Sequence, residues 1–217
     1  MIVSRQRGYI FVHVPKTGGT ALALALEARA APDDILIGDT PKARARARRL
    51  RGAATVGRLW KHSRLADLPG LVAEDEMRAM FVFTLVRNPW DRVVSYYHWL
   101  RAQGFDHPAV HLAARTSFCD FVRHPHTRAS LAAHPYGAYV RLPGGVEQCG
   151  AFVRLERFAA DIAPVEAHLG FPVRLPGRVN ASARARDWRQ HYDETAAEAV
   201  AQACAEDIAR FGYRFDP

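Results

Sequence analysis

Two short segments of the chain carry residue types that suit the binding of anions. The first, residues 13–20 (HVPKTGGT), stands between an apolar run and a run of helix-forming residues. Its two glycines allow backbone N–H groups to close around an anion, and the start of a helix adds unpaired N–H groups with partial positive charge. Lys16 adds a full charge, and Thr17 and Thr20 add hydroxyl groups. The segment therefore predicts a loop that binds a phosphate or sulfate group.

This loop differs from the Walker A pattern, G-x-x-x-x-G-K-[ST]. Lys16 precedes the glycines instead of following them, and no leading glycine opens the loop. An isolated Gly18-Gly19 pair would indicate only an ordinary turn beside a surface lysine. The order strand, PKTGGT and helix favours an anion-binding loop over that simpler interpretation.

The second segment, residues 87–95 (RNPWDRVVS), follows another apolar run. Arg87 stands at the C-terminal end of the predicted strand, which is where open α/β sheets bind their ligands. Asn88 and Pro89 suit the cap and the first position of a helix. Ser95 comes seven residues after Asn88, about two helical turns, and so shares the face of the cap. We expect Arg87 and Ser95 to converge on a second phosphate, and Arg92 to form a surface ion pair.

The elements that must position these segments are indicated by apolar patterning. Strands are predicted at 9–14, 80–86 and 152–155, which are short apolar runs typical of buried strands. Helices are predicted directly after Gly19, over an apolar stripe from Trp90 to Leu100, over about a dozen residues ending at Gly170, and from 194 to 211. Strands that alternate with helices indicate one α/β domain with a mainly parallel central sheet flanked by helices.

Composition narrows the class of protein further. The 217 residues include 30 Lys and Arg against 22 Asp and Glu, a formal net charge of +8 that favours an anionic ligand. No apolar run approaches the roughly 18 to 20 residues of a membrane span. The first residues do not resemble a signal peptide, and three scattered cysteines argue against a disulfide framework. We expect a cytoplasmic protein without a transmembrane segment.

Together the two segments resemble the 5′-phosphosulfate loop and the 3′-phosphate motif of sulfotransferases that use 3′-phosphoadenosine 5′-phosphosulfate (PAPS). The similarity is greatest to the carbohydrate-type, Golgi-like branch and its small bacterial relatives. It continues through 152–158 (FVRLERF), 180–182 (NAS) and 207–213 (DIARFGY). The resemblance implies a single sulfotransferase domain over 1–217 with a P-loop-like three-layer fold. The segments 32–54 and 103–150 depart from the family, and acceptor-binding elements are expected there.

The resemblance also implies a reaction and a set of donor contacts. A sulfuryl group would move in line from PAPS to a hydroxyl or amine of an acceptor, with positioning and charge stabilisation dominating catalysis, as in phosphoryl transfer. Lys16 would stabilise the bridging oxygen of the departing 5′-phosphate. Thr17, Gly18, Gly19 and Thr20 would hold that phosphate, and Arg87 and Ser95 the 3′-phosphate. No acidic residue in the loop is placed to hold magnesium, so we expect a metal-independent reaction.

A general base is needed to accept the proton of an acceptor hydroxyl. His62, in the element Lys61-His62-Ser63, resembles the catalytic-histidine segment of the family, and a neutral imidazole titrates in the useful range. The alternative is a surface or helix-capping histidine. His13 is expected to be a packed core histidine, and Glu156 a structural ion-pair residue beside Arg154.

Two basic segments remain open to two interpretations each. Asn180 and Arg184 belong either to a loop that contacts the donor or to a solvated basic loop. The run 42–49 (KARARARR) is either a solvated helix face or a contact surface for an anionic acceptor. It contains no aromatic residue, and nucleic-acid binding is therefore not expected. An acidic glycan or a small hydroxylated metabolite fits the charge; the family favours a carbohydrate or glycoconjugate.

Two other functions are compatible with a phosphate-binding loop. A nucleotide kinase or related phosphotransferase would require a magnesium-holding carboxylate after a strand, whereas the strand before Arg87 leads into basic residues. A non-catalytic module that binds anionic glycans would have little use for two separate phosphate-binding segments. The sequence therefore favours the sulfotransferase.

Overall fold

The structure is a computed structural model that describes residues 1–176 and 187–216. The chain forms two compact units. Unit 1 comprises Met1–Val86 and Tyr136–Val179, and unit 2 comprises Arg87–Pro135 and Asn180–Pro217. Each unit has its own apolar core, and the expectation of a single domain stays a prediction.

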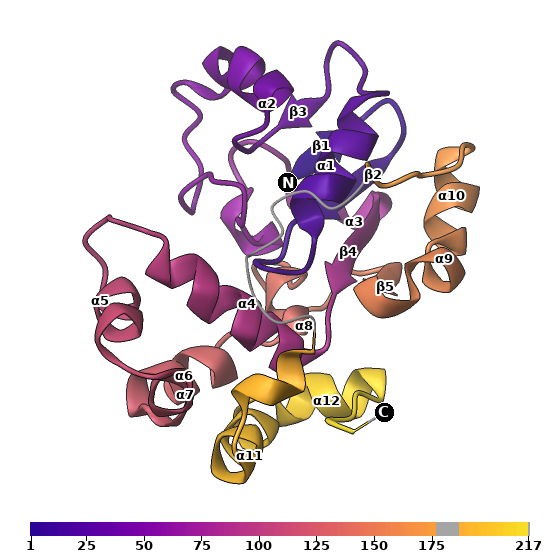
Figure 1. Cartoon of the computed structure of the whole chain (residues 1–217). Helices are drawn as coiled ribbons and strands as arrows, with labels where there is room; N and C mark the ends of the chain where they lie inside the picture. The colour runs from indigo at the N-terminus through magenta and orange to yellow at the C-terminus, as the bar shows by residue number, and fades with distance from the viewer. Residues whose placement is uncertain (177–186, 217) are drawn as a thin grey trace. The chain divides into compact units, whose positions relative to one another are not determined.

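Unit 1 is built on a five-stranded sheet with the order β3-β1-β2-β4-β5 (Figure 1). Its strands are β1 (Ile2–Ser4), β2 (Tyr9–Val12), β3 (Ile35–Leu36), β4 (Phe81–Val86) and β5 (Ala151–Arg154). The β2–β4 and β4–β5 pairs are parallel, whereas β1 pairs antiparallel with both β2 and β3. The predicted α/β class is confirmed, and the sheet is mixed, with two parallel and two antiparallel strand pairs, where a mainly parallel sheet was predicted. Strands β1 and β3, which have three and two residues, were not predicted from the sequence.

Helices of unit 1 connect the strands and cover the sheet. They are α1 (Gly19–Glu27), α2 (Pro41–Arg46), η1 (Ala47–Leu50), η2 (Leu65–Asp67), α3 (Glu74–Ala79), α8 (Tyr136–Tyr139), η3 (Leu155–Arg157), α9 (Phe158–Asp161) and α10 (Ala163–Leu169). Leu22 and Leu26 of α1 and Val165 of α10 pack with Phe11 and Phe83 of the sheet in one apolar cluster. The predicted helix before Gly170 is divided into α9 and α10, and Gly170 does end it with a φ of 73°.

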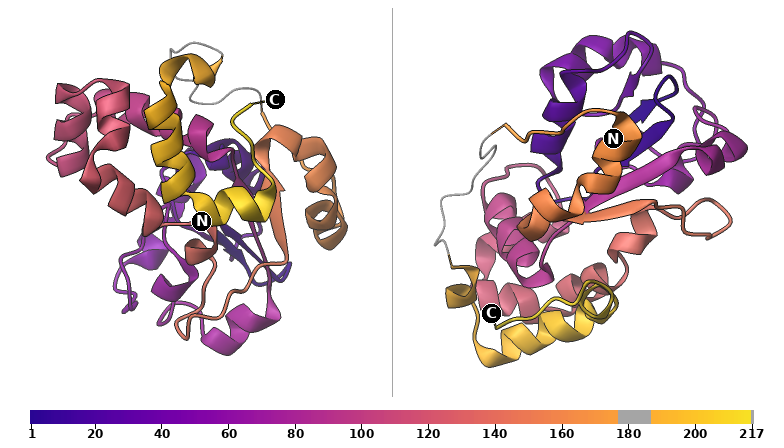
Figure 2. Two further views of the ribbon diagram at one scale, coloured as in Figure 1. Left: turned by 90° about the horizontal axis from the view of Figure 1, so that it is seen from below. Right: turned by 90° about the vertical axis from the view of Figure 1, so that its right-hand side faces the viewer.

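Unit 2 is helical. Its elements are α4 (Pro89–Arg101), α5 (Pro108–Arg115), α6 (Phe118–Arg123), α7 (Pro125–Ala132), η4 (Trp188–His191), α11 (Glu194–Ala203) and α12 (Ala205–Phe211). Asn88 caps α4 as predicted, because its side chain accepts a hydrogen bond from the Trp90 amide at 3.1 Å. The predicted apolar stripe of α4 is buried and packs against α5, α6 and α11. The predicted helix 194–211 is broken at Cys204, and α11 and α12 run in different directions (Figure 2, left).

Candidate active site

The predicted anion-binding loop joins β2 to α1 in unit 1. Lys16 has a φ of 66°, and it is the one described residue other than glycine with a positive φ. Such a conformation costs on the order of 1–3 kcal/mol and is retained where the surrounding structure demands it, often at functional sites. Here the Thr17 hydroxyl donates a hydrogen bond to the Val14 carbonyl at 2.9 Å and closes the loop around Lys16. The loop thus holds a strained lysine at the end of a strand.

Both glycines of the loop are required by geometry. Gly18 has a φ of 86°, and a Cβ there would also lie 3.0 Å from Leu155 Cδ1. Gly19 does not have a positive φ, but a Cβ on it would lie 2.1 Å from Cδ2 of the His13 ring. His13 is only 6% exposed and stacks on Phe11 at 6.0 Å between ring centroids. The His13 ring therefore occupies the place that any side chain at Gly19 would take.

The first turn of α1 offers backbone donors without competition from acidic side chains. Gly18 is the N-cap, no side chain caps the helix, and the first turn contains no Asp or Glu. The first N–H groups of a helix have no intrahelical partner, and the helix dipole makes them partly positive. The N-terminal end of α1 therefore suits a bound anion, which these N–H groups would stabilise as they stabilise a capping carboxylate. The predicted loop and its helix are present together.

His62 lies against this loop. Its Nδ1 is 2.8 Å from the His13 carbonyl oxygen, and the two imidazole rings meet edge to face at 4.6 Å. Because a carbonyl oxygen only accepts, Nδ1 carries the proton and Nε2 of the neutral ring keeps its lone pair. Burial lowers the pKa of His62 to about 4, so that the ring is neutral at physiological pH. A ring in this tautomer can accept a proton at Nε2, as a general base must.

The segment that carries His62 is held by a buried hydroxyl. Ser63 Oγ accepts a hydrogen bond from the Trp60 amide and lies within hydrogen-bond distance of the Arg58 and Trp60 carbonyl oxygens. Trp60 itself is 48% exposed and meets the His62 ring edge to face at 4.9 Å. An exposed indole therefore stands next to the candidate base.

The second predicted phosphate-binding segment belongs to unit 2. The Arg87 guanidinium forms an ion pair with Asp91 at 2.6 Å, and its Nε donates to Asp91 Oδ2 at 2.8 Å. Arg87, Asp91 and Ser95 are spaced by four residues and thus share one face of the segment that begins α4. Both side chains of the pair are largely buried, at 14% and 15% exposure. Asp91 therefore fixes the direction of Arg87 along the first turn of the helix.

Several predicted side chains have surroundings that the sequence did not indicate. The Thr17 hydroxyl, expected to face the ligand, is wholly buried and donates within the loop, so only its backbone amide can serve the site. Ser95 is only 8% exposed. Arg154 forms an ion pair with Asp161 at 2.6 Å, a partner that the sequence did not indicate, and the role of Glu156 stays a prediction. Asn180 and Arg184 lie outside the described residues.

Functional residues were also missed. Asp91 was not singled out, although its spacing of four from Arg87 at a helix start is the usual signal of an ion pair. The packing of His13 against Gly19 had no signal in the residue types, because only the closed shape of the loop brings the ring over the glycine. Trp60 was not singled out, although it stands only two residues before His62. The structure brings the loop and His62 together in unit 1. Arg87 and Ser95 belong to unit 2.

Two features are absent from the described residues, a metal-binding cluster and a membrane-spanning helix. No three His, Cys, Asp or Glu side chains in this part of the chain gather closely enough to hold a metal ion. Likewise, none of the helices over residues 1–176 and 187–216 is long and apolar enough to cross a membrane.

Comparison with known proteins places the chain in a family. A sequence model described as the sulfotransferase family matches residues 1–133 of the 217. The chain belongs to the sulfotransferase family. Among solved structures, mouse sulfotransferase SULT7A1 complexed with PAP resembles it with a TM-score of 0.51 and 16% identity, over 94% of this chain and 85% of that chain. That likeness shows the fold alone. No curated protein matches the sequence.

Proposed function

We propose that this sulfotransferase moves a sulfuryl group from PAPS to a hydroxyl or amine of an acceptor, in line and without a metal ion. The observation that carries the proposal is the strained Lys16, held by a closed glycine loop at the start of α1. The similar mouse sulfotransferase is complexed with PAP, which we take to be the desulfated donor. The match to the sulfotransferase family covers both predicted donor segments.

The 5′ end of the donor is assigned to the loop. The backbone amides of Thr17, Gly18, Gly19 and Thr20 would surround the 5′-phosphate, with Lys16 at the bridging oxygen. When the bond between sulfur and that oxygen breaks, negative charge gathers on the oxygen, and the ammonium stabilises it. A lysine kept in a strained backbone conformation is already positioned before the reaction, and no further ordering is needed as charge develops.

The 3′ end of the donor is assigned to Arg87 and Ser95. The ion pair with Asp91 orients the guanidinium, which suits it to a planar two-point contact with phosphate oxygens. Ser95 follows on the same helix face. Asn180 and Arg184 remain proposed further contacts to the donor. Because the family match runs from unit 1 into unit 2, we propose that residues 1–217 act as one sulfotransferase domain.

The acceptor proton is assigned to His62. Nε2 would take the proton from the acceptor hydroxyl while the new bond between oxygen and sulfur forms, and the His13 carbonyl would hold Nδ1–H throughout. The half-exposed Trp60 beside it offers a flat apolar surface to the body of the acceptor. This surface and the basic composition suit a carbohydrate or glycoconjugate, acidic ones included.

Calorimetry separates this function from its competitors. We expect 3′-phosphoadenosine 5′-phosphate to bind in the presence of EDTA, and to bind tighter than ATP with magnesium. Preference for ATP with magnesium would support a phosphotransferase and end the proposal. Binding of heparin fragments without binding of either nucleotide would indicate a glycan-binding module. Labelled PAPS incubated with a panel of sugars then identifies the acceptor.

A further inference from the structure

A cavity in unit 1 lies apart from the proposed donor loop. It has a volume of about 230 Å³ and is bordered by Arg5, Arg46 and Arg49. A second hollow beside His13 and Thr20 has only about 10 Å³, room for no more than about one water molecule. Of these two cavities, the larger has room for a small organic molecule.

The position of this cavity follows from the sheet register. Arg5 comes directly after Ser4, which pairs with Tyr9 at the start of β2, whereas the donor loop leaves the other end of β2. Ile35, which lines the cavity, belongs to the edge strand β3, and β1 separates it from β2. The cavity therefore lies at the edge of the sheet and cannot share a ligand atom with the loop amides.

The arginines at this cavity are already ordered by backbone carbonyl groups. Arg46 donates to the Ala31 carbonyl at 2.7 Å, and Arg49 donates to the Pro32 carbonyl. Among the described residues, neither has a carboxylate within ion-pair distance, whereas Arg5 is paired with Glu76 at 2.6 Å. Arg46 and Arg49 thus bring two positive charges to the cavity with no carboxylate in direct ion-pair contact, although Arg46 also interacts with Glu27 at longer range. Their remaining N–H groups suit an anion.

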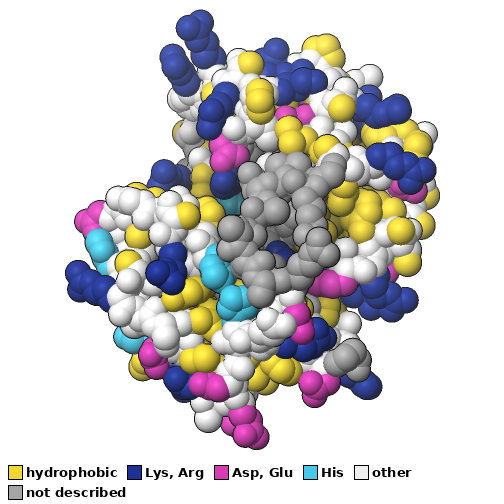
Figure 3. Space-filling model, in the orientation of Figure 1, with side chains coloured by type: hydrophobic (Ala, Val, Ile, Leu, Met, Phe, Trp, Pro, Cys, Tyr) yellow, Lys and Arg dark blue, Asp and Glu magenta, His cyan; other side chains and the backbone are white. Residues whose placement is uncertain are grey.

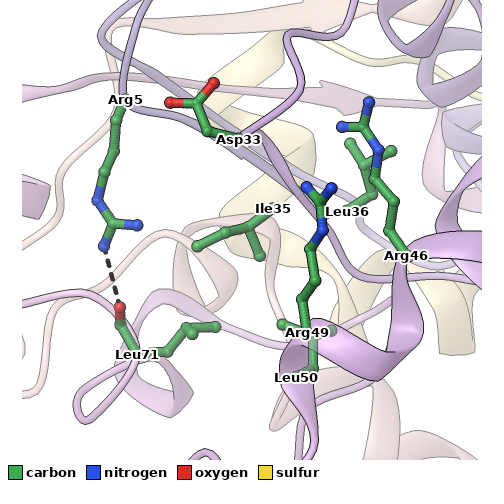
Figure 4. A pocket seen from close by; sticks show the side chains of 8 residues that line it. All are labelled: Arg5, Asp33, Ile35, Leu36, Arg46, Arg49, Leu50 and Leu71. Carbon is green, nitrogen blue, oxygen red and sulfur yellow. Dashed lines mark hydrogen bonds between the residues drawn. The ribbon is translucent and has the colours of Figure 1, made fainter.

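The floor of the cavity is apolar. Ile35 lies between Arg5 and Arg49 in the close-up view of Figure 4, and Leu36 and Leu50 line the cavity as well. The carboxylate of Asp33 is the negative group of the lining, and it favours a ligand with one negative charge over a ligand with several. In Figure 3, Lys and Arg side chains gather at the top of the view, where Figure 1 places α2. The positive electrostatic potential of these side chains favours the approach of anions.

From this arrangement we propose a second binding site at the edge of the sheet, for a small organic anion with one carboxylate, sulfate or phosphate group on an apolar body. The guanidinium groups of Arg46 and Arg49 bind the charged end, and the aliphatic side chains of β3 and η1 contact the body. The site is separate from the proposed donor site and does not depend on it. A polyanion or an uncharged ligand does not fit both parts of the lining.

Benzoate, benzamide and acetate test the proposal, because they separate charge from apolar contact. Each is titrated by saturation-transfer NMR into the full chain with 3′-phosphoadenosine 5′-phosphate at saturating concentration. We expect saturable benzoate binding, at least tenfold tighter than that of the uncharged benzamide or of acetate. Equal affinities for benzoate and acetate would show that apolar contact does not contribute and would overturn the proposal of an apolar subsite. Equal affinities for benzoate and benzamide would overturn the proposal that the guanidinium groups bind the charged end. A parallel benzoate titration is run without the nucleotide. A benzoate signal that appears only in that titration would assign benzoate to the donor site instead.

A matched pair of variants locates the ligand. Arg49→Met removes one guanidinium at the cavity but keeps the length of the side chain, and Arg48→Met makes the same change at its exposed neighbour, which does not line the cavity. We expect benzoate affinity to fall at least tenfold in the first and less than twofold in the second. Circular dichroism checks that both variants fold. Equal affinity in both variants would exclude this site.

Discussion

The contact between His13 and Gly19 makes the substitution Gly19→Ala a sharp test of the loop geometry. A methyl group at position 19 would lie 2.1 Å from His13 Cδ2 and 2.4 Å from Nε2. Because carbon atoms in ordinary contact are about 3.5–4.0 Å apart, the ring or the loop must shift by roughly 1.4 Å or more. The ring is buried against Phe11 and His62, so we expect the strain to reach the loop.

We expect Gly19→Ala to lower the free energy of unfolding by about 1–3 kcal/mol, as overpacking of a core does. We also expect it to weaken binding of 3′-phosphoadenosine 5′-phosphate at least tenfold, because the loop amides move. Urea unfolding and calorimetry measure the two effects. Gly8→Ala is the control, since Gly8 has a positive φ but nothing within 4 Å of the added Cβ. It should lose stability and keep nucleotide affinity.

The steric origin is isolated by a double-mutant cycle. In the variant with both His13→Ala and Gly19→Ala, the methyl group no longer meets a ring. We expect this double variant to be more stable than the sum of the single effects by at least about 1 kcal/mol, and to regain nucleotide affinity. Additive effects within about 0.5 kcal/mol would refute the reasoning, as would normal stability of Gly19→Ala.

Three further predictions concern the reaction. Lys16→Ala should lower kcat far more than it weakens nucleotide binding. Lys16→Gly should have the same effect on kcat and should also raise the stability of the protein, because glycine adopts the positive φ without strain. Equal losses in kcat and in nucleotide affinity would reduce Lys16 to a binding residue. His62→Ala should abolish transfer and leave nucleotide binding intact. Because burial lowers the pKa of His62 to about 4, kcat/KM of the unaltered enzyme should fall only as pH drops toward about 4, where the ring becomes protonated. A fall in kcat/KM that begins near pH 6.5 would contradict this prediction. Trp60→Ala should raise the acceptor KM several-fold and leave the nucleotide affinity unchanged. Val56→Ala, at an exposed residue of the same segment, should change neither quantity. If Trp60→Ala has the same acceptor KM as the unaltered enzyme, Trp60 is not part of the acceptor site.

The basic run 42–49 illustrates how partners distant in sequence change an interpretation. The sequence left it as a solvated face or a contact surface, and the structure confirms helix over Pro41–Arg46. Lys42 and Arg46, however, donate to the carbonyl groups of Glu27 and Ala31. These bonds order the run against the end of α1, and no periodicity within the run could have indicated them.

The sequence by itself determined the elements whose cause is local. The apolar runs that became β2 and β4, the cap at Asn88 and the glycine loop all depend on residues within a few positions of one another. These elements are stabilised by hydrogen bonding and burial along a short stretch of chain, and the pattern of residue types in that stretch therefore predicts them. The sulfotransferase resemblance was confirmed for the same reason, since its motifs lie within such stretches.

Only the tertiary structure decided what fills the space around those motifs. The ring of His13 over Gly19, the tautomer of His62 and the inward turn of the Thr17 hydroxyl all follow from packing between segments far apart in the chain or from the closed shape of the loop. The short strands β1 and β3 likewise exist because β1 pairs with β2 on one side and with the edge strand β3 on the other. Strands of two or three residues have no stable form on their own, so their pairing supplies what the local sequence lacks.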